Sequence, residues 1–385
     1  MSDHLCKITH MSEHTGEGRQ RSAAEASIAD AACAGAFVTG LLFADLVFAG
    51  LADPPSPGAE VWSDDLVVGP GGIANFAVAL RRLGTPVALA AVAGDDLLGR
   101  HCWSVLAGEG IDLERSRLVE GWSTPVTVAL AYAGDRALVT HGSPPPIAGD
   151  ALVGTPPRCA ATAVHLEDVE PRWLREIQAQ GTLVFGDVGW DPSGRWSGEL
   201  LAQLGRCHAF TPNATEAMRY TGTSDPAEAL DRLAELVPLA VVTCGADGAM
   251  AVDSTTGERA TVPGLSVRAI DPTGAGDVFT AALIHATLAG WPLAARLAFA
   301  NLTAALSTER AGGALGAPRL SELGHWWRQH APHVGPASPL AQHAVLGPLL
   351  AAGLAPADTV TDAPTDTPSH TTNHSKEWNA HGHHT

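Results

Sequence analysis

The residues best suited to carry out chemistry lie in the segment DPTGAGDVFTAALIHATLAG, residues 271–290. A turn containing Gly274 and Gly276 leads into an apolar helical pattern, and Asp277 falls in the first turn of that helix. Glycines let the backbone approach a ligand closely. The first N–H groups of a helix have no partner within the helix and, together with the helix dipole, favour an anion. The segment therefore predicts an anion site with a carboxylate beside it.

An anion site next to a carboxylate suits phosphoryl transfer. The backbone N–H groups of Gly274, Ala275 and Gly276 would stabilise the charge that grows on the transferred group. Asp277 would accept the proton of an attacking hydroxyl. The alternative is that Asp277 only caps the helix. A cap would not require the two glycines or the second acid, Asp271, so phosphoryl transfer to an alcohol is the leading hypothesis.

The lysine content excludes several other ways of binding phosphate. The only lysines are Lys7 and Lys376, near the two ends of the 385-residue chain. The segment between them therefore lacks the lysine of a P-loop, of a protein-kinase strand or of a pyridoxal Schiff base. The net charge of −18 also disfavours binding to nucleic acid or to anionic lipid. Phosphate must be held here by backbone N–H groups, arginine or a metal ion.

Short apolar runs alternate with longer helical patterns, which predicts βαβ units and an α/β fold with a mainly parallel sheet. Strands are expected at residues 37–38, 87–92, 163–166, 183–185 and 239–243, and helices at 73–83, 171–179, 227–236, 275–289 and 293–306.

Two stretches depart from this alternation. Residues 122–142 contain two alternating strand patterns around a turn at 134–135, which predicts a β-hairpin. Residues 45–68 are extended and contain prolines. Together the two stretches predict a small sheet that stands off the main body as a lid. The alternative is that they form edge strands of the main sheet.

Composition changes at both ends of the chain. Residues 1–32 predict a flexible leader, 33–330 the folded domain, and 331–385, rich in Thr, Pro, Asp and His, a largely disordered tail. The six cysteines are scattered without a C-x-x-C pair, which indicates reduced thiols. No apolar run reaches the roughly 18 residues of a membrane span, and the start has no signal-peptide core. A cytoplasmic protein is therefore expected.

The segment at 271–290 resembles the C-terminal signature of the ribokinase-like (PfkB-type) carbohydrate kinases. The stretch VGPGGIANFAVAL resembles the N-terminal signature of that family, with Gly71, Gly72 and Asn75. TPNATEA and VVTCGADGAM resemble two further family elements between the signatures. The matches follow the family's order and cover roughly residues 35–325, whereas the two ends lie outside the resemblance.

The resemblance implies a three-layer α/β/α body with a small β-sheet lid, and phosphorylation of a hydroxyl of a small polyol by ATP with Mg²⁺. It implies that Asp277 is the base and that residues 274–276 form the anion hole. The implied contacts to substrate hydroxyls are Asp45, Gly71, Gly72, Asn75 and Glu167. Those lining the ATP site are Asn213, Glu216, Thr243, Gly245, Gly248 and Asn301. Glu216 would also position hydrated Mg²⁺, and Asp271 and Thr273 would contribute to a monovalent-cation (K⁺) site. A homodimer through the lid is a further implication.

Several of these residues have a purely structural alternative. Asn75 and Glu216 could belong to helix starts, Gly245 and Gly248 could only shape a turn, and Asn301 could be a helix-surface amide. Histidines are expected to be structural, His165 among them, because the proposed chemistry needs none.

The substrate is less well defined. Family members that act on sugar acids carry an Asp-x-Asn-x-Arg stretch, and this chain has Gly189 and Asp191 in place of the amide and the cation. An acid there would repel a carboxylate or phosphate, so a neutral sugar is favoured, with a nucleoside as the alternative.

Two rival functions belong to other classes. GPGGIA at residues 69–74 matches a relaxed dinucleotide fingerprint, which would indicate an NAD-dependent dehydrogenase. A non-catalytic sugar- or nucleotide-binding regulator of the same fold is the other. The dehydrogenase hypothesis leaves DPTGAGD unexplained, and the intact Asp277 argues against the regulator.

Overall fold

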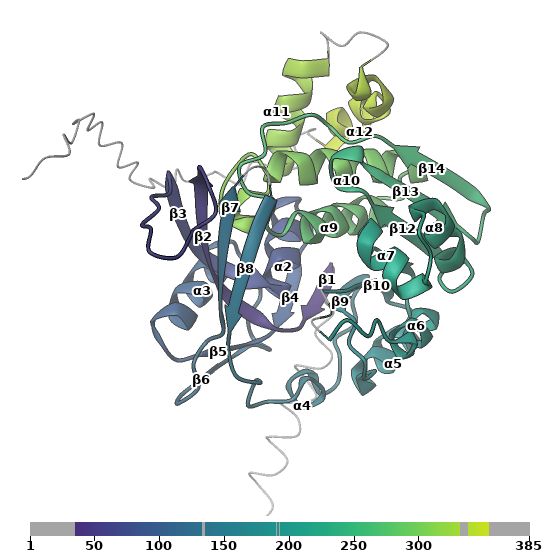
Figure 1. The fold of residues 1–385 in the computed structure, drawn as a ribbon. Helices are drawn as coiled ribbons and strands as arrows, with labels where there is room; N and C mark the ends of the chain where they lie inside the picture. Colours follow the sequence, from purple (N-terminus) through teal and green to yellow (C-terminus); the bar gives the residue numbers. More distant parts are fainter. Residues whose placement is uncertain (1–34, 133–134, 190, 192, 332–337, 354–385) are drawn as a thin grey trace, which may run out of the picture.

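The computed structural model describes residues 35–132, 135–189, 191, 193–331 and 338–353 (Figure 1). In this part of the chain the main sheet has eight strands in the order β14-β13-β12-β11-β10-β9-β1-β4. The strands from β12 to β4 are parallel, whereas β13 and β14 are antiparallel. The bounds are β1 Ala36–Thr39, β4 Val87–Ala90, β9 Ala161–His165, β10 Leu183–Asp187, β11 Ala209–Phe210, β12 Leu239–Thr243, β13 Ala249–Asp253 and β14 Glu258–Val262. The predicted α/β fold with a mainly parallel sheet is confirmed.

Helices cover both faces of this sheet and bury a separate apolar core on each. One face packs against α2 Ile73–Arg82, α9 Ala275–Leu288, α10 Leu293–Ser307 and α11 Leu320–His330. The other face packs against α4 Gly149–Val153, α5 Arg172–Ala179, α6 Gly198–Ala202, α7 Ala214–Thr221 and α8 Pro226–Ala234. Short 3₁₀ turns follow as η1 Gln203–Arg206, η2 Gly245–Asp247 and η3 Gly313–Gly316. The result is the three-layer α/β/α body that the resemblance implied.

A second sheet stands apart from the first, with the strand order β3-β2-β7-β8. Its strands are β2 Leu42–Leu51, β3 Asp65–Gly72, β7 Val126–Tyr132 and β8 Asp135–His141. We call these four strands the lid sheet. The hairpin and the extended stretch therefore pair with each other, and neither forms an edge of the main sheet. Residue 134, in the expected hairpin turn, lies outside the described residues.

The expected strand at 87–92 is divided in two. β4 stays in the main sheet, whereas β5 Val92–Gly94 pairs with β6 Arg117–Val119 in a two-stranded sheet. Helix α3 Leu97–Gly108 lies between them in sequence, and Asp96 caps its start by accepting the N–H of Gly99 at 2.7 Å. This helix was not among those expected from the apolar pattern.

The expected tail begins too early at residue 331. Within it, η5 Pro339–His343 and α12 Leu346–Gly353 are ordered helical segments, and Leu340, Leu346 and Leu350 join the core beside α10 and α11. The run PLAQHAVLGPLL places apolar residues at helical spacing, which the Thr/Pro/Asp-rich composition further on concealed. The expected leader and residues 354–385 lie outside the described residues.

Two expectations about the environment can be compared with the described part of the chain. No helix there is both long enough and apolar enough to cross a membrane. Among the described cysteines, Cys102, Cys207 and Cys244 are free thiols.

The packing of α12 leads to a first prediction. Leu346→Ala should lower the free energy of unfolding by about 2–4 kcal/mol, because Leu346 is fully buried in the core. The neighbouring substitution Val345→Ala serves as the control and should change it by less than about 0.5 kcal/mol, since Val345 is exposed. Urea unfolding followed by fluorescence measures both. Equal midpoints for the two variants would show that α12 does not pack on the body in solution.

Candidate active site

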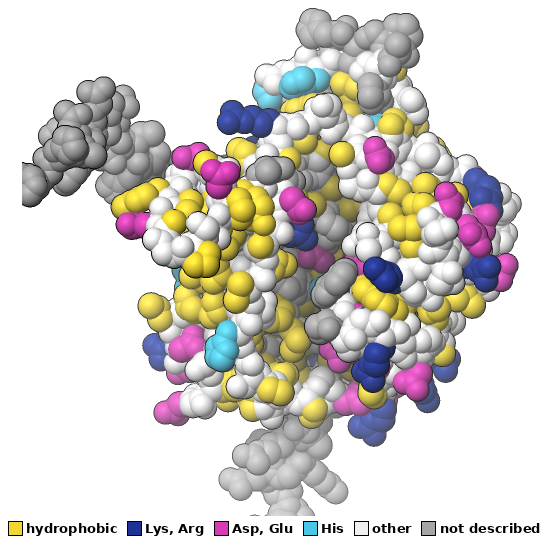
Figure 2. Space-filling view, viewed as in Figure 1, with side chains coloured by type: hydrophobic (Ala, Val, Ile, Leu, Met, Phe, Trp, Pro, Cys, Tyr) yellow, Lys and Arg dark blue, Asp and Glu magenta, His cyan; other side chains and the backbone are white. Residues whose placement is uncertain are grey.

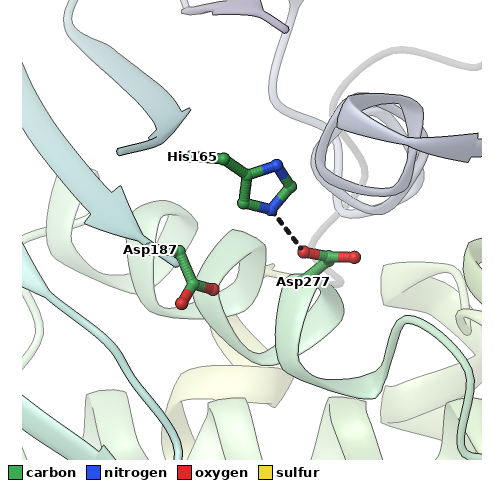
Figure 3. A group of neighbouring side chains, drawn as sticks. All are labelled: His165, Asp187 and Asp277. Atoms are coloured by element: carbon green, nitrogen blue, oxygen red, sulfur yellow. Dashed lines mark hydrogen bonds and ion pairs between the residues drawn. The ribbon is translucent and has the colours of Figure 1, made fainter. Parts of the chain in front are cut away.

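The carboxylate of Asp277 lies at the centre of the site. Helix α9 begins directly after Gly274, which has a left-handed backbone conformation (φ 70°), and Asp277 follows in its first turn. The Nδ2 group of Asn75, on α2, donates to Asp277 Oδ2 at 2.8 Å. The Nε2 atom of His165, at the end of β9, lies 3.2 Å from Asp277 Oδ1 (Figure 3). Both oxygens of the expected base therefore have a partner, each from a different element.

Asp187 joins this group from the end of β10. It pairs in register with His165, so the two side chains leave neighbouring parallel strands on the same side. One polar atom from each of His165, Asp187 and Asp277 lies within 4.8 Å of the others. Thr280 Oγ1, one turn beyond Asp277 on α9, lies 3.5 Å from Asp187 Oδ2. Asp187 thus lines the same polar site as the base.

Sequence analysis did not assign His165 or Asp187 to the site, and it expected His165 to be structural. A usable signal was present. His165 lies in the strand expected at 163–166, and Asp187 follows the strand expected at 183–185 by two residues. In a parallel sheet the carboxyl ends of the strands meet at one edge, where ligands bind.

The turn before α9 has the geometry of an anion site. A side chain at Gly274 would approach the amide of Asn75 to 3.0 Å, so this position fits glycine both by conformation and by space. The N–H of Ala275 donates to Pro272 O at 3.2 Å. The backbone hydrogen bonds between described residues include none donated by Gly274 or Gly276 at this turn. The expected three donors are therefore reduced to these two, because Ala275 closes the turn.

Asp271 connects this turn to a second loop. Its Oδ1 accepts the N–H of Thr273 at 2.9 Å, and its Oδ2 accepts the N–H groups of Gly312 and Gly313 at 2.9 and 3.1 Å. The buried hydroxyl of Thr273 has no partner among the described residues. Thr273 thus offers a free oxygen that fits a cation, whereas both oxygens of Asp271 already accept backbone N–H groups and hold the loop.

The expected substrate side is built from the lid sheet. The carboxyl of Asp45, on β2, lies directly against Gly71 on β3, where an added Cβ would come within 1.9 Å of its Oδ2. Gly72 has a positive φ of 61° and no room for a side chain beside Leu41 and Phe43, so it joins β3 to α2. Asp45, Gly71 and Asn75 therefore lie close to Asp277, along one path from β2 to α2.

The side chain of Glu167 is different. Glu167 is exposed two residues after the end of β9, and only its backbone oxygen has a described bond, which it accepts from Gln203. The structure does not bring Glu167 into the bonded group around Asp277.

Carboxyl groups crowd this site, and burial changes their acidity. Burial, and then the charges of Asp277 and Asp271, raise the pKa of Asp45 to about 7. Burial also raises the pKa of Asp187 well above its ordinary value, although the charge of His165 opposes the change. The pKa of Glu216 is raised by burial as well. In Figure 2, acidic side chains are visible in a hollow between the lid sheet and the body.

The expected nucleotide residues gather at the ends of β11 and β12. Asn213 caps α7 by accepting the N–H of Glu216 at 3.0 Å, and Glu216 Oε2 accepts the N–H of Asn213 at 2.9 Å. Asn213 also bridges to Thr243 at the end of β12. The structural alternative for Glu216 is thus realised as a capping box. Glu216 remains close enough to Asp277 and His165 for their charges to affect its pKa.

Gly245 and Gly248 lie in the loop after β12, and Asn301 lies on α10. A side chain at Gly248 would meet Val262 O at 2.2 Å, and its φ of 99° favours glycine. The amide of Asn301 is buried and donates to the oxygens of Val262 and Pro263. Asn301 is therefore not a surface amide. It holds the segment after β14 against the loop at 245–248.

Comparison with known proteins agrees with this architecture. A family model described as pfkB family carbohydrate kinase matches residues 38–320. A ribokinase from Schizosaccharomyces pombe is 28% identical over 280 residues, which cover 68% of this chain and 87% of that protein. A nucleoside kinase from Methanothermobacter thermautotrophicus is 27% identical over 267 residues, or 66% of this chain and 82% of that protein.

A solved structure shares the fold. An E. coli protein crystallised in complex with ATP and Mg²⁺ superimposes with a TM-score of 0.64 at 21% identity, covering 77% of this chain and 100% of that one.

The raised pKa of Asp45 leads to a second prediction. The carboxyl ionises near pH 3.8 in the unfolded chain and near pH 7 in the folded one, so unfolding releases a proton between these values. Stability should fall as the pH rises through this window. Asp45→Asn removes the penalty, and at pH 8 we expect it to increase the free energy of unfolding by roughly 2–4 kcal/mol.

The gain should shrink to about 0.5 kcal/mol near pH 4, where Asp45 is protonated in the folded state and about half protonated in the unfolded one. Urea unfolding at the two pH values measures it, with Asp135→Asn, an exposed position in the same sheet, as the control. A gain of the same size at both pH values would show that it does not come from the raised pKa of Asp45.

Proposed function

Because the chain belongs to the pfkB family of carbohydrate kinases, we propose that it transfers a phosphoryl group from ATP to a hydroxyl of a neutral sugar. The observation that carries this proposal is the hydrogen-bonded carboxylate of Asp277, placed in the first turn of α9 next to the free N–H groups of Gly274 and Gly276. The carboxylate would accept the proton of the attacking hydroxyl, and the N–H groups would stabilise charge on the transferred phosphoryl group.

The chain's own residues would divide the work as follows. Asp45 and the backbone at Gly71 and Gly72 bind and orient the acceptor hydroxyls. The attacking hydroxyl lies against the carboxylate of Asp277 and gives its proton to one of the oxygens as the new bond to phosphorus forms. The N–H groups at the start of α9 stabilise charge on the transferred group. No lysine lies within the described residues, so these dipoles carry much of that role.

The nucleotide would lie along the loop at Thr243, Gly245 and Gly248. Asn301 holds the end of β14 against this loop. Asn213 and Glu216 would position hydrated Mg²⁺ near the phosphates, and Glu216 fits this role because it is a buried acid close enough to Asp277 for their charges to interact. Mg²⁺ would supply charge neutralisation for the phosphates when bound. A monovalent cation, K⁺ for instance, would contact the free hydroxyl of Thr273 beside Asp271.

A neutral acceptor is favoured by the acid content of the site. Asp45, Asp187, Glu216 and Asp277 face one another, and an anionic sugar would add to their repulsion. Asp191 forms its own turn by accepting the N–H groups of Ser193 and Trp196, and it offers no cation where acid-specific relatives have one. A nucleoside is the second candidate, since a related protein is a nucleoside kinase.

The lid sheet would close over the acceptor and exclude water from the transferred group. Asp45 belongs to this sheet while Asn75 belongs to the body, so an acceptor bound between them would join the two parts. Leu66 and Val139 leave apolar area exposed on one face of the lid sheet. A second copy of the chain packing on that face would form the homodimer expected from the sequence.

A third prediction concerns the acceptor. ADP formation from ATP should be stimulated strongly by one or more neutral sugars, and weakly or not at all by sugar acids and sugar phosphates, in a panel that also contains nucleosides. A coupled assay for ADP measures this for each compound. Stimulation by a nucleoside alone would replace the sugar with the second candidate. Stimulation only by anionic sugars would overturn the electrostatic argument.

The fourth prediction tests the base. Asp277→Asn keeps the size of the side chain but cannot accept the proton, so kcat should fall at least ~10²-fold while ATP affinity stays nearly unchanged. The control is Asp231→Asn. Asp231 is an exposed acid that pairs with Arg259, and it lies on α8, which covers the face of the main sheet opposite to α9. Turnover of Asp277→Asn near the wild-type rate would remove Asp277 from the mechanism.

A further inference from the structure

His165 occupies a position that the phosphoryl-transfer chemistry leaves without a role. It ends β9, in the middle of the main sheet between β1 and β10. Its imidazole packs against the ring of Phe76, with centroids 5.0 Å apart, and about a third of the side chain (32%) remains exposed toward the site. Phe76 follows Asn75 directly on α2, so neighbouring positions of one helix contact the imidazole of His165 and the carboxylate of Asp277.

The imidazole and the amide hold one carboxylate from two sides. Asn75 donates to Oδ2 and His165 lies against Oδ1, which leaves the remaining lone pairs of Asp277 directed to the open part of the site. We propose that His165 is a positioning residue for Asp277, which as an imidazolium holds this carboxylate oriented and ionised before the acceptor binds. This inference rests on the proposed role of Asp277 as the base.

The surrounding charges explain why a cation is needed there. The acids that face His165 come from three elements: Asp187 on β10, Glu216 on α7 and Asp277 on α9. Asp45 on β2 also acts on Asp277. Burial in such company favours neutral acids, as the raised pKa values of Asp45, Asp187 and Glu216 indicate. A base must stay ionised in the same surroundings.

The imidazole can supply the missing positive charge. Burial lowers the pKa of His165, but the hydrogen bond and charge of Asp277, with the charges of Asp187 and Glu216, more than offset this and raise it. An imidazole that already carries its proton cannot take a second one from the acceptor. His165 therefore acts before transfer, and the hydroxyl proton ends on Asp277.

The test is the pH dependence of kcat/KM for wild type and His165→Gln. Glutamine keeps an N–H donor but has no charge, so the acid limb of the profile should move to higher pH. On the acid limb the variant should lose about tenfold in kcat/KM relative to wild type, which corresponds to a limb displaced by about one unit. Well above the acid limb, where kcat/KM no longer depends on pH, the two should agree within about threefold.

The matched control is His285→Gln. His285 lies on the same helix as Asp277, bonds to Thr85 and packs against Trp291 and Phe299, but it is remote from the acids of the site. Its acid limb should coincide with that of wild type. A loss in His165→Gln that is equal at every pH, or a limb that does not move, would reduce His165 to a packing residue and overturn the proposal.

A measurement without turnover keeps the proposal testable if His165→Gln folds poorly. The imidazole of His165 can be assigned by NMR through its contact with the Phe76 ring and titrated in wild type and in Asp277→Asn. Its pKa should lie above the ordinary value in wild type and fall in the variant. Equal values in the two proteins would overturn the pairing.

The two hypotheses fail separately. If Asp277→Asn is inactive while His165→Gln shows no displaced limb, only the positioning role is wrong. If Asp277→Asn turns over normally, the base itself is wrong, whatever His165 does.

Discussion

The carboxylate of Asp277 depends on two partners that come from distant parts of the chain. Asn75 comes from the start of α2 and His165 from the end of β9, and they contact opposite oxygens of the same group at 2.8 and 3.2 Å. Only the finished sheet, with α2 and α9 packed side by side on one face, brings these atoms together. The fold thus places one hydrogen-bonded carboxylate in the first turn of α9, directly after the turn at Gly274.

The rest of the site follows from keeping acids close together in a body without lysine. Asp45 and Asp187 are buried, and burial raises their pKa values, which favours the protonated, neutral form of each carboxyl. A neutral carboxyl costs less to bury than an ionised one. Asp271 avoids repulsion in another way, since three backbone N–H groups satisfy its oxygens and lock the turn before α9 to the loop at 312–313. His165 then supplies a positive charge beside Asp277. Neutral acids, backbone dipoles and one imidazole thus take the place that lysine holds in other phosphate sites.

Local signals in the sequence were enough to predict the fold class and the helix start that carries Asp277. DPTGAGD combines a turn, a helix start and a carboxylate within seven residues, so its geometry is largely independent of the rest of the chain. His165 and Asp187 could not be found in this way, because their nearness depends on strand register between segments 22 residues apart. The contacts of Asn301 could not be predicted either, since its partners Val262 and Pro263 lie at the end of β14, 39 and 38 residues away in the sequence. Helix α12 was hidden because polar composition beyond it outweighed a short apolar period.

The most direct test of the central claim is a crystal structure of the protein with a non-hydrolysable ATP analogue and the acceptor that it phosphorylates. The account predicts that the reacting hydroxyl lies within about 3 Å of an Asp277 oxygen, that the terminal phosphate faces the N–H groups of Gly274 and Gly276, and that His165 keeps its contact with Asp277. A hydroxyl bonded instead to Asp187 or His165, with Asp277 turned away from the phosphate, would contradict it.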